Sequence, residues 1–154
     1  MPYARVISIR SLLLALMCCL ASLAAWGDDI AQIKSANGPV FIERAGQRLP
    51  AQAGARVRVA DTIITGAGGS AGVTFVDNSL LSVGPNSVLV IDRFLFNSTT
   101  HEGAFDSSLR KGTLSVVSGK IAKQTPEAMK VKTPSSILGA RGTEFVVRAG
   151  DAAE

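Results

Sequence analysis

The sequence predicts an exported all-β domain, and three features support this prediction. Short runs rich in Val, Ile, Thr and Phe recur along the chain between Gly, Pro, Asn and Asp, which is typical of strands joined by turns. Beyond the first 27 residues, no stretch repeats apolar residues at helical spacing. With 47% hydrophobic and 18% charged residues, the chain is also too apolar to be intrinsically disordered. The expected fold is a compact sandwich or a flattened β-solenoid of about 10–12 short strands, preceded by a signal peptide.

The N-terminal segment, residues 1–27, is predicted to be that signal peptide. Arg5 and Arg10 precede an apolar run from Leu12 to Ala25, and this order of a basic head, an apolar middle and small residues directs export. We expect cleavage before Asp28. An uncleaved segment would instead act as a membrane anchor, and membrane contact is expected in that case alone.

Both cysteines of the chain, Cys18 and Cys19, lie in the predicted signal peptide. Cleavage at the expected site, or after Ala24 as an alternative, therefore leaves a domain without disulfides, thiol nucleophiles or thiolate metal sites. We expect residues 28–154 to form one domain that is held together by its apolar core.

The candidate strands follow one another at short spacing. In chain order they are Ile30–Ser35, Val40–Arg44, Thr62–Thr65, Ala71–Val76, Ser79–Val83, Ser87–Ile91, Phe94–Asn97, Ala104–Leu109, Thr113–Val117, Met129–Thr133 and Glu144–Arg148. Because the connections are short, neighbouring strands should be antiparallel or should coil as rungs. The polar stretch Lys120–Ala128 is expected to be a loop. Consecutive apolar residues at Leu80-Leu81, Val88–Ile91 and Val116-Val117 predict strands that are covered on both faces.

Three motifs carry a family resemblance. They are Asp61-Thr62-Ile63-Ile64-Thr65-Gly66, the run Phe75–Ser87 with its Asp77-Asn78 turn, and Thr133-Pro134 followed by Gly139-Ala140-Arg141-Gly142-Thr143-Glu144-Phe145. Together they resemble the FecR domain, which is named from the ferric-citrate regulator of Gram-negative bacteria, over Pro39–Val147. Asn78 stands where the family usually has Gly, and Asn tolerates the left-handed backbone that such a turn requires.

The resemblance implies an exported all-β module used for interaction, with no catalytic residues, cofactor or metal. In the regulator itself, a membrane helix joins this kind of domain to a cytoplasmic anti-sigma segment. Because Met1–Arg10 alone precede the apolar run and the chain ends at Glu154, we expect a stand-alone exported member and not the full sigma regulator. The expected location is the periplasm of a Gram-negative bacterium, with secretion or inner-membrane anchoring as alternatives.

The motif residues are candidates for a structural or an interaction role. They are Asp77, Asn78, Thr133, Pro134, Gly139, Arg141, Gly142, Thr143 and Glu144. We favour a structural role, because Gly139 and Gly142 would allow a sharp corner that Arg141 clamps by hydrogen bonds to carbonyls or to Glu144. Recognition of a ligand by Arg141 is the alternative.

Charge is segregated along the exported chain. Six basic residues lie between positions 110 and 132, where Glu127 is the one acidic residue: Arg110, Lys111, Lys120, Lys123, Lys130 and Lys132. Lys130 and Lys132 are expected to share a strand face. These residues form a predicted basic patch for anionic glycan or lipid head groups. A solvated face, or an edge strand protected by lysines, is the other interpretation.

The remaining composition argues against two other functions. Arg5 and Arg10 account for two of the 16 basic residues, so 14 remain in the domain against 12 acidic ones, and this balance predicts no nucleic-acid binding. A single histidine, His101, and no cysteine leave no recognisable catalytic motif, so no enzyme is expected. A small hydrolase would need a concave site with convergent polar groups.

We therefore expect a non-enzymatic module for interaction or ligand sensing in the cell envelope. Its expected partner is an envelope protein, which could dock by strand addition or on a surface patch. Binding of anionic glycan or lipid head groups through segment 110–132 is the alternative.

Overall fold

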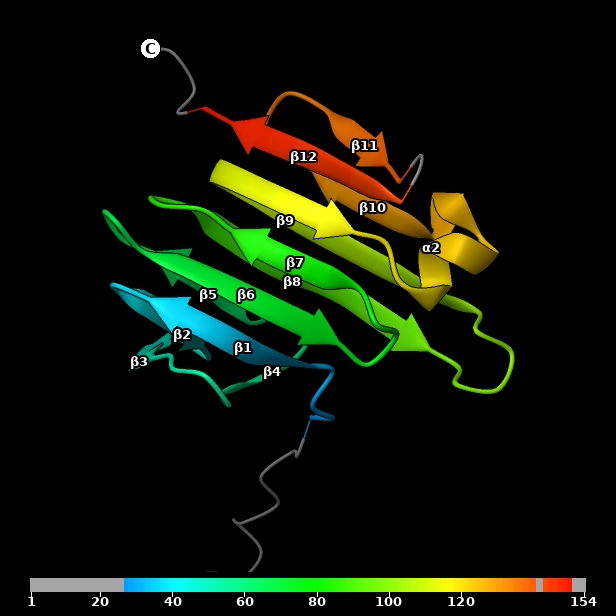
Figure 1. Ribbon diagram of the computed structural model, residues 1–154, viewed down its shortest axis with the longest axis horizontal. Coiled ribbons are helices and arrows are strands. Elements are labelled where there is room, and N and C mark those ends of the chain that lie inside the picture. The colour runs from blue at the N-terminus through cyan, green and yellow to red at the C-terminus, as the bar shows by residue number, and fades with distance from the viewer. Residues whose placement is uncertain (1–26, 141–142, 151–154) are drawn as a thin grey trace, which may run out of the picture.

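The computed structural model describes residues 27–140 and 143–150, and these residues form one curled β-sheet (Figure 1). The sheet contains twelve strands in the described part of the chain, which confirms the predicted all-β class. The strands are β1 (Ala31–Asn37), β2 (Val40–Arg44), β3 (Gln47–Pro50), β4 (Arg56–Val57), β5 (Thr62–Thr65), β6 (Ser70–Phe75), β7 (Leu80–Val83), β8 (Val88–Phe96), β9 (Gly103–Val117), β10 (Met129–Lys132), β11 (Ile137–Gly139) and β12 (Glu144–Ala149). Two short helices, α2 (Lys120–Gln124) and η2 (Pro126–Ala128), join β9 to β10.

The sheet folds into two layers because the long strand β9 belongs to both. The first half of β9 pairs with β8 and β10, and the second half pairs with β7 and β12. Gly112, with φ of +96°, lies between the two halves. One layer also contains β1, β4 and β6, and the other also contains β2, β3, β5 and β11. The pairings among the described strands are antiparallel except for β9 with β10, so the fold is a two-layered curled sheet and not a stack of parallel rungs.

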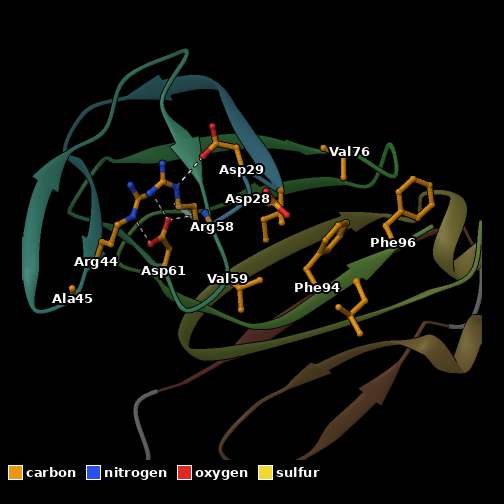
Figure 2. A pocket seen from close by; sticks show the side chains of 13 residues that line it. Asp28, Asp29, Arg44, Ala45, Arg58, Val59, Asp61, Val76, Phe94 and Phe96 are labelled. Atoms are coloured by element: carbon orange, nitrogen blue, oxygen red, sulfur yellow. Dashed lines mark hydrogen bonds and ion pairs between the residues drawn. The ribbon is translucent and has the colours of Figure 1, made fainter. Parts of the chain in front are cut away.

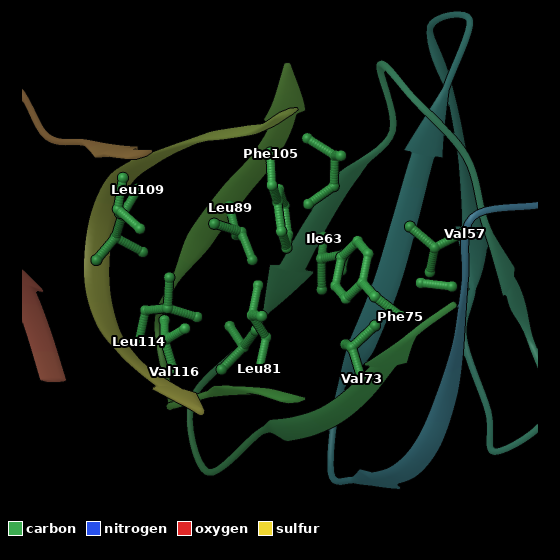
Figure 3. Close-up of a cluster of buried hydrophobic side chains, with 14 of the residues drawn as sticks. Val57, Ile63, Val73, Phe75, Leu81, Leu89, Phe105, Leu109, Leu114 and Val116 are labelled. Carbon is green, nitrogen blue, oxygen red and sulfur yellow. The ribbon is translucent and has the colours of Figure 1, made fainter. Parts of the chain in front are cut away.

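The apolar core fills the space between the two layers (Figure 3). Phe75 from β6 meets Phe94 from β8 and Phe105 from β9, with ring centroids 4.5–5.4 Å apart. Aromatic pairs at such distances contribute about 0.5–1.5 kcal/mol beyond the burial of their area. Aliphatic side chains of both layers complete the core, among them Leu81, Leu89, Leu109, Leu114 and Val116.

The prediction that the doubly apolar strands are covered on both faces was wrong at β7 and at the end of β9, whereas Val88 and Val90 of β8 are half-buried on their outer face. In β7, Leu81 and Val83 are buried whereas Leu80 and Ser82 are exposed. Leu80 lies directly opposite Val117 of β9, and both are exposed on the outer face of their layer. The outer face is open to solvent, and the consecutive apolar residues form a cross-strand pair on that face instead of a second core.

Two strands are longer than expected. The candidates Ser87–Ile91 and Phe94–Asn97 form the single strand β8, in which the register shifts between Ile91 and Arg93. The candidates Ala104–Leu109 and Thr113–Val117 likewise form β9. Polar residues that resemble turns, such as Asp92, are accommodated by bulges that bend a strand without ending it.

Strands β3, β4 and β11 were not expected, and the segment expected to be a loop, Lys120–Ala128, forms α2 and η2. Strand β3 is exposed throughout, so it carries no apolar alternation, and it follows β2 through a turn at Ala45 and Gly46 with positive φ at both residues. Helix α2 is too short to show a helical period, although it buries Ile121 and Ala122.

Candidate functional site

The Asp77-Asn78 motif has a structural role at the turn between β6 and β7. Asn78 has φ of +67°, which confirms the expected left-handed conformation. The buried Asp77 carboxylate accepts hydrogen bonds from the Ser79 amide at 3.0 Å and from the Ser79 hydroxyl at 2.7 Å. It also accepts the Ile121 amide at 3.4 Å, while the Asp77 carbonyl accepts the Lys120 amide at 2.7 Å. The motif therefore attaches the start of α2 to the sheet.

The Thr133-Pro134 motif closes the turn between β10 and β11. The Thr133 amide donates to the Ser136 carbonyl at 2.7 Å, and the Ser136 amide donates to the Thr133 hydroxyl at 3.1 Å. Pro134 is exposed inside this turn. These contacts fix the reversal of the chain, which is a structural role.

The stretch from Gly139 to Glu144 forms no corner at its first glycine. Gly139 belongs to β11, has no positive φ, and a Cβ added to it would meet nothing within 4 Å. The predicted corner is therefore wrong at Gly139, because this glycine has the extended backbone of a strand and no positive φ. The Thr143 carbonyl accepts the Ser118 amide at 2.8 Å, and Glu144 opens β12. Arg141 and Gly142 lie outside the described residues, so the arginine clamp stays a prediction.

The predicted basic patch is divided among three places. Lys120 and Lys123 lie on α2, and Arg110 and Lys111 lie beside the bend of β9. Lys130 and Lys132 lie on one face of β10, as predicted, and they alternate with buried residues.

One part of the patch surrounds a small hollow. Arg110 of β9 and Lys132 of β10 line it together with Thr133 and Pro134, and its volume is about 240 Å³. Two of the six predicted cations therefore line the same hollow.

A larger groove, of about 680 Å³, opens where the described chain begins (Figure 2). We call it the N-terminal groove. Its charged lining residues are Asp28, Asp29, Arg44, Arg58 and Asp61, and its larger apolar ones are Ile30, Val59, Val76, Phe94, Leu95 and Phe96. The groove thus joins the segment before β1 to the end of β2, the β4–β5 connection, the β6–β7 turn and the end of β8.

A bidentate ion pair forms one end of the groove. Asp61 is 1% exposed, and its Oδ1 accepts Arg44 Nε at 2.8 Å while its Oδ2 accepts Arg44 Nη2 at 2.6 Å. The Asp61 carboxylate also accepts the Arg58 amide at 2.8 Å. The hydrogen bonds to Asp61 raise the pKa of the Arg44 guanidinium against the opposing effect of its burial, so this arginine stays protonated.

The second charged pair lies on the rim. Arg58 Nε donates to Asp29 Oδ1 at 2.9 Å, and both side chains are about one-third exposed, at 34% and 36%. Asp28 is exposed and forms no ion pair with a described residue. The other four charged residues of the lining form these two pairs.

The other end of the groove is apolar. Val76 and Leu95 are exposed, and Phe96 is half-buried beside the buried ring of Phe94. In Figure 2, Val76, Phe94 and Phe96 lie away from the Arg44–Asp61 pair, with Val59 between the two ends. Exposed apolar side chains gathered in one concavity are typical of a site that binds another molecule.

No pattern in the sequence indicated this groove. Asp61 belongs to a family motif, but Arg44 lies 17 residues earlier, at the end of β2. The position of Asp61 directly before the apolar run Thr62–Thr65 indicated that this carboxylate could be buried, and a buried carboxylate needs a partner. Nothing in the sequence showed which arginine is that partner.

Among the described residues, no group of three or more His, Cys, Asp and Glu side chains is placed to hold a metal ion. In the same part of the chain, no helix combines the length and apolar character needed to cross a bilayer.

A comparison with protein families adds one match. The family model described as FecR protein matches residues 61–153. No curated protein and no solved structure matches the chain. The matched range begins at Asp61 and includes the apolar end of the groove, whereas Arg44, Arg58 and Asp28 precede it.

Proposed function

The chain belongs to the FecR family, and from this premise we propose that it is a non-enzymatic interaction module of the cell envelope that binds a partner protein in the N-terminal groove. The observation that carries the proposal is the exposed apolar surface of Val59, Val76 and Leu95 inside one concavity. Location in the periplasm is part of the proposal. It is supported by residues 1–27, in which basic residues precede an apolar run as in a signal peptide.

The lining of the groove indicates the chemistry of its partner. The apolar end favours an aliphatic or aromatic side chain, whose burial contributes about 1.5–3 kcal/mol. Cleavage at the expected site would leave an α-ammonium group on Asp28 beside its carboxylate, so this residue would carry no net charge at the rim. We therefore propose that the groove recognises a segment of an envelope protein through an apolar side chain.

The paired charges prepare the groove for binding. Arg44 is held by two hydrogen bonds to Asp61 and by a third to the Arg56 carbonyl at 3.0 Å. A side chain that is already immobile loses little conformational entropy when a partner binds. The Arg44–Asp61 pair thus keeps its end of the groove open before the partner arrives.

A crosslinking experiment in living cells tests this function. A photoreactive benzophenone amino acid is placed at Val76 or at Leu95, and as a control at Ser135, which is exposed in the turn between β10 and β11 and lines no part of the groove. Irradiation should give a discrete protein adduct in the envelope fraction from both groove positions and none from the control. Equal adducts from all three positions, or none from the groove, would contradict the proposal.

A matched pair of substitutions adds a second readout. Val59→Asp places a charge in the groove, and Leu49→Asp places the same charge on β3, at residues of nearly equal exposure, 42% and 45%. The first substitution should reduce the adduct from Val76 at least about 10-fold, because an unpaired carboxylate opposes burial of the apolar partner. The second should leave it unchanged.

A second function is supported by the hollow between Arg110 and Lys132. Two cations on one concavity suit a phosphate or carboxylate group of an envelope glycan or lipid. The other four predicted cations, Lys111, Lys120, Lys123 and Lys130, do not line the hollow, so we propose this hollow and not the whole segment 110–132 as the anion site.

A further inference from the structure

Strand β12 is an edge strand whose outer side has no partner among the described strands. Its other side pairs with β9, from Glu144 opposite Val117 to Ala149 opposite Gly112. An unpaired edge exposes a row of amide and carbonyl groups, and soluble proteins usually protect such an edge or use it for pairing.

The exposed side chains of β12 have a self-complementary order. Glu144, Val146 and Arg148 lie on the outer face, and Val146 is 64% exposed. If a second β12 pairs antiparallel about a two-fold axis at Val146, each Glu144 lies opposite an Arg148 and the two valines face each other. Neither charged residue forms an ion pair with a described residue of its own chain.

The two layers also have different numbers of strands on the β12 side of β9. Beyond β9, one layer has β12 alone, whereas the other has β10 and then β11 (Figure 1). Leu138 of β11 is paired with the buried Val131, so it lies on the inner face of its layer, and yet it is 38% exposed. One further strand beside β12 would lie opposite β11 and cover this side chain.

From these three observations we propose that β12 is the interface through which two copies of this chain pair, edge to edge and antiparallel, with Val146 on the two-fold axis. The paired β12 strands extend one layer across both copies. Residues Glu144–Arg148 and Leu138 form a small interface, so the dimer should be weak, with a dissociation constant in the micromolar range. This surface shares no residue with the N-terminal groove, and its test is independent of the proposed function.

Sedimentation equilibrium of the purified protein over about 1–500 µM tests the interface, because this range spans the expected dissociation constant. Glu144→Arg or Arg148→Glu alone replaces attraction by repulsion at both symmetric pairs, and should weaken the dimer about 10-fold or more. The double variant E144R/R148E restores opposite charges at both places and should return the dissociation constant to within about 3-fold of the original. Val146→Lys should abolish the dimer.

Lys34→Glu, on the exposed side of β1, is the control and should leave the dissociation constant unchanged. Circular dichroism shows whether each variant keeps its β structure, and the rescue by the double variant remains informative if Val146→Lys does not fold. A protein that stays monomeric over the whole range would overturn the proposal, and so would a dimer that ignores the two single swaps. Binding of an extended segment from another protein at β12, without self-association, would also reject it.

Discussion

Asp61 shows how much one buried side chain can organise. Its two oxygens accept three hydrogen bonds, two from the Arg44 side chain and one from the Arg58 amide. These contacts connect β2, the β4–β5 connection and the rim of the N-terminal groove. Because the Asp61 carboxylate is buried, it needs these hydrogen-bond donors to offset its loss of hydration, and the donors need its oxygens as acceptors.

Asp61→Ala should therefore lower the free energy of unfolding by about 2–4 kcal/mol, because it leaves the Arg44 guanidinium and the Arg58 amide without their acceptor. Urea denaturation of the purified variant measures this loss. Arg48→Ala is the control, since Arg48 and Glu43 form an exposed pair at 3.6 Å whose removal should change stability by less than about 0.5 kcal/mol. Equal effects of the two substitutions would show that Asp61 does not have the structural role assigned to it.

At the same scale, local and distant contacts differed in how far they could be predicted. The left-handed Asn78 was expected because the requirement lies within a single turn of the chain. The Arg44–Asp61 pair was not, because it forms only when β2 and β5 lie side by side. Gly139 was misassigned because a glycine permits a corner without requiring one.

At the scale of elements, β9 determines the architecture. Among the described strands, it is the one that pairs with members of both layers, and Gly112 lies at the change of direction with φ of +96°. A Cβ at this position would overlap the Ser87 side chain, so both the backbone conformation and the available space require glycine. The Ser87 hydroxyl also accepts a hydrogen bond from the Thr113 amide at 3.0 Å, which supports the bend from the residue before β8.

Gly112→Ala should destabilise the protein by about 2–4 kcal/mol, from the strained φ together with the displacement of Ser87. Gly139→Ala is the matched control on β11, where an added methyl group meets nothing, and it should change stability by less than about 0.5 kcal/mol. Thermal unfolding followed by circular dichroism compares the two variants. A large loss at Gly139 with none at Gly112 would reverse our assignment of the structurally required glycine.

At the scale of the whole molecule, the fold separates three surfaces that the sequence mixes. The N-terminal groove lies at the ends of β2 and β8, the cationic hollow between β9 and β10, and the self-complementary edge on β12. Because they use different residues, each can be altered without damage to the other two.

The charge-reversal variant R110E/K132E tests the cationic hollow. It should weaken binding of the protein to vesicles of equal parts phosphatidylglycerol and phosphatidylcholine, or to purified peptidoglycan, by about 10-fold at low salt. The control K120E/K123E makes the same change in net charge on α2, and should have a smaller effect. If both variants lose binding equally, binding to the anionic surface depends on net charge and not on the hollow. If neither variant binds less than the unaltered protein, the anion site is excluded. Vesicles and peptidoglycan, measured separately, distinguish a lipid from a glycan ligand.

The sequence by itself determined the class of this protein: strands with short turns, a family motif, and a segregation of charge between residues 110 and 132. These properties depend on neighbours along the chain, where alternation, turn chemistry and composition can be read directly. Only the tertiary structure decided that β8 and β9 are continuous, that Arg44 reaches Asp61, and that the six basic residues divide among three places. Each of these depends on which strands become neighbours when the sheet curls. That choice is made by packing of the whole core, which no single segment of the sequence encodes.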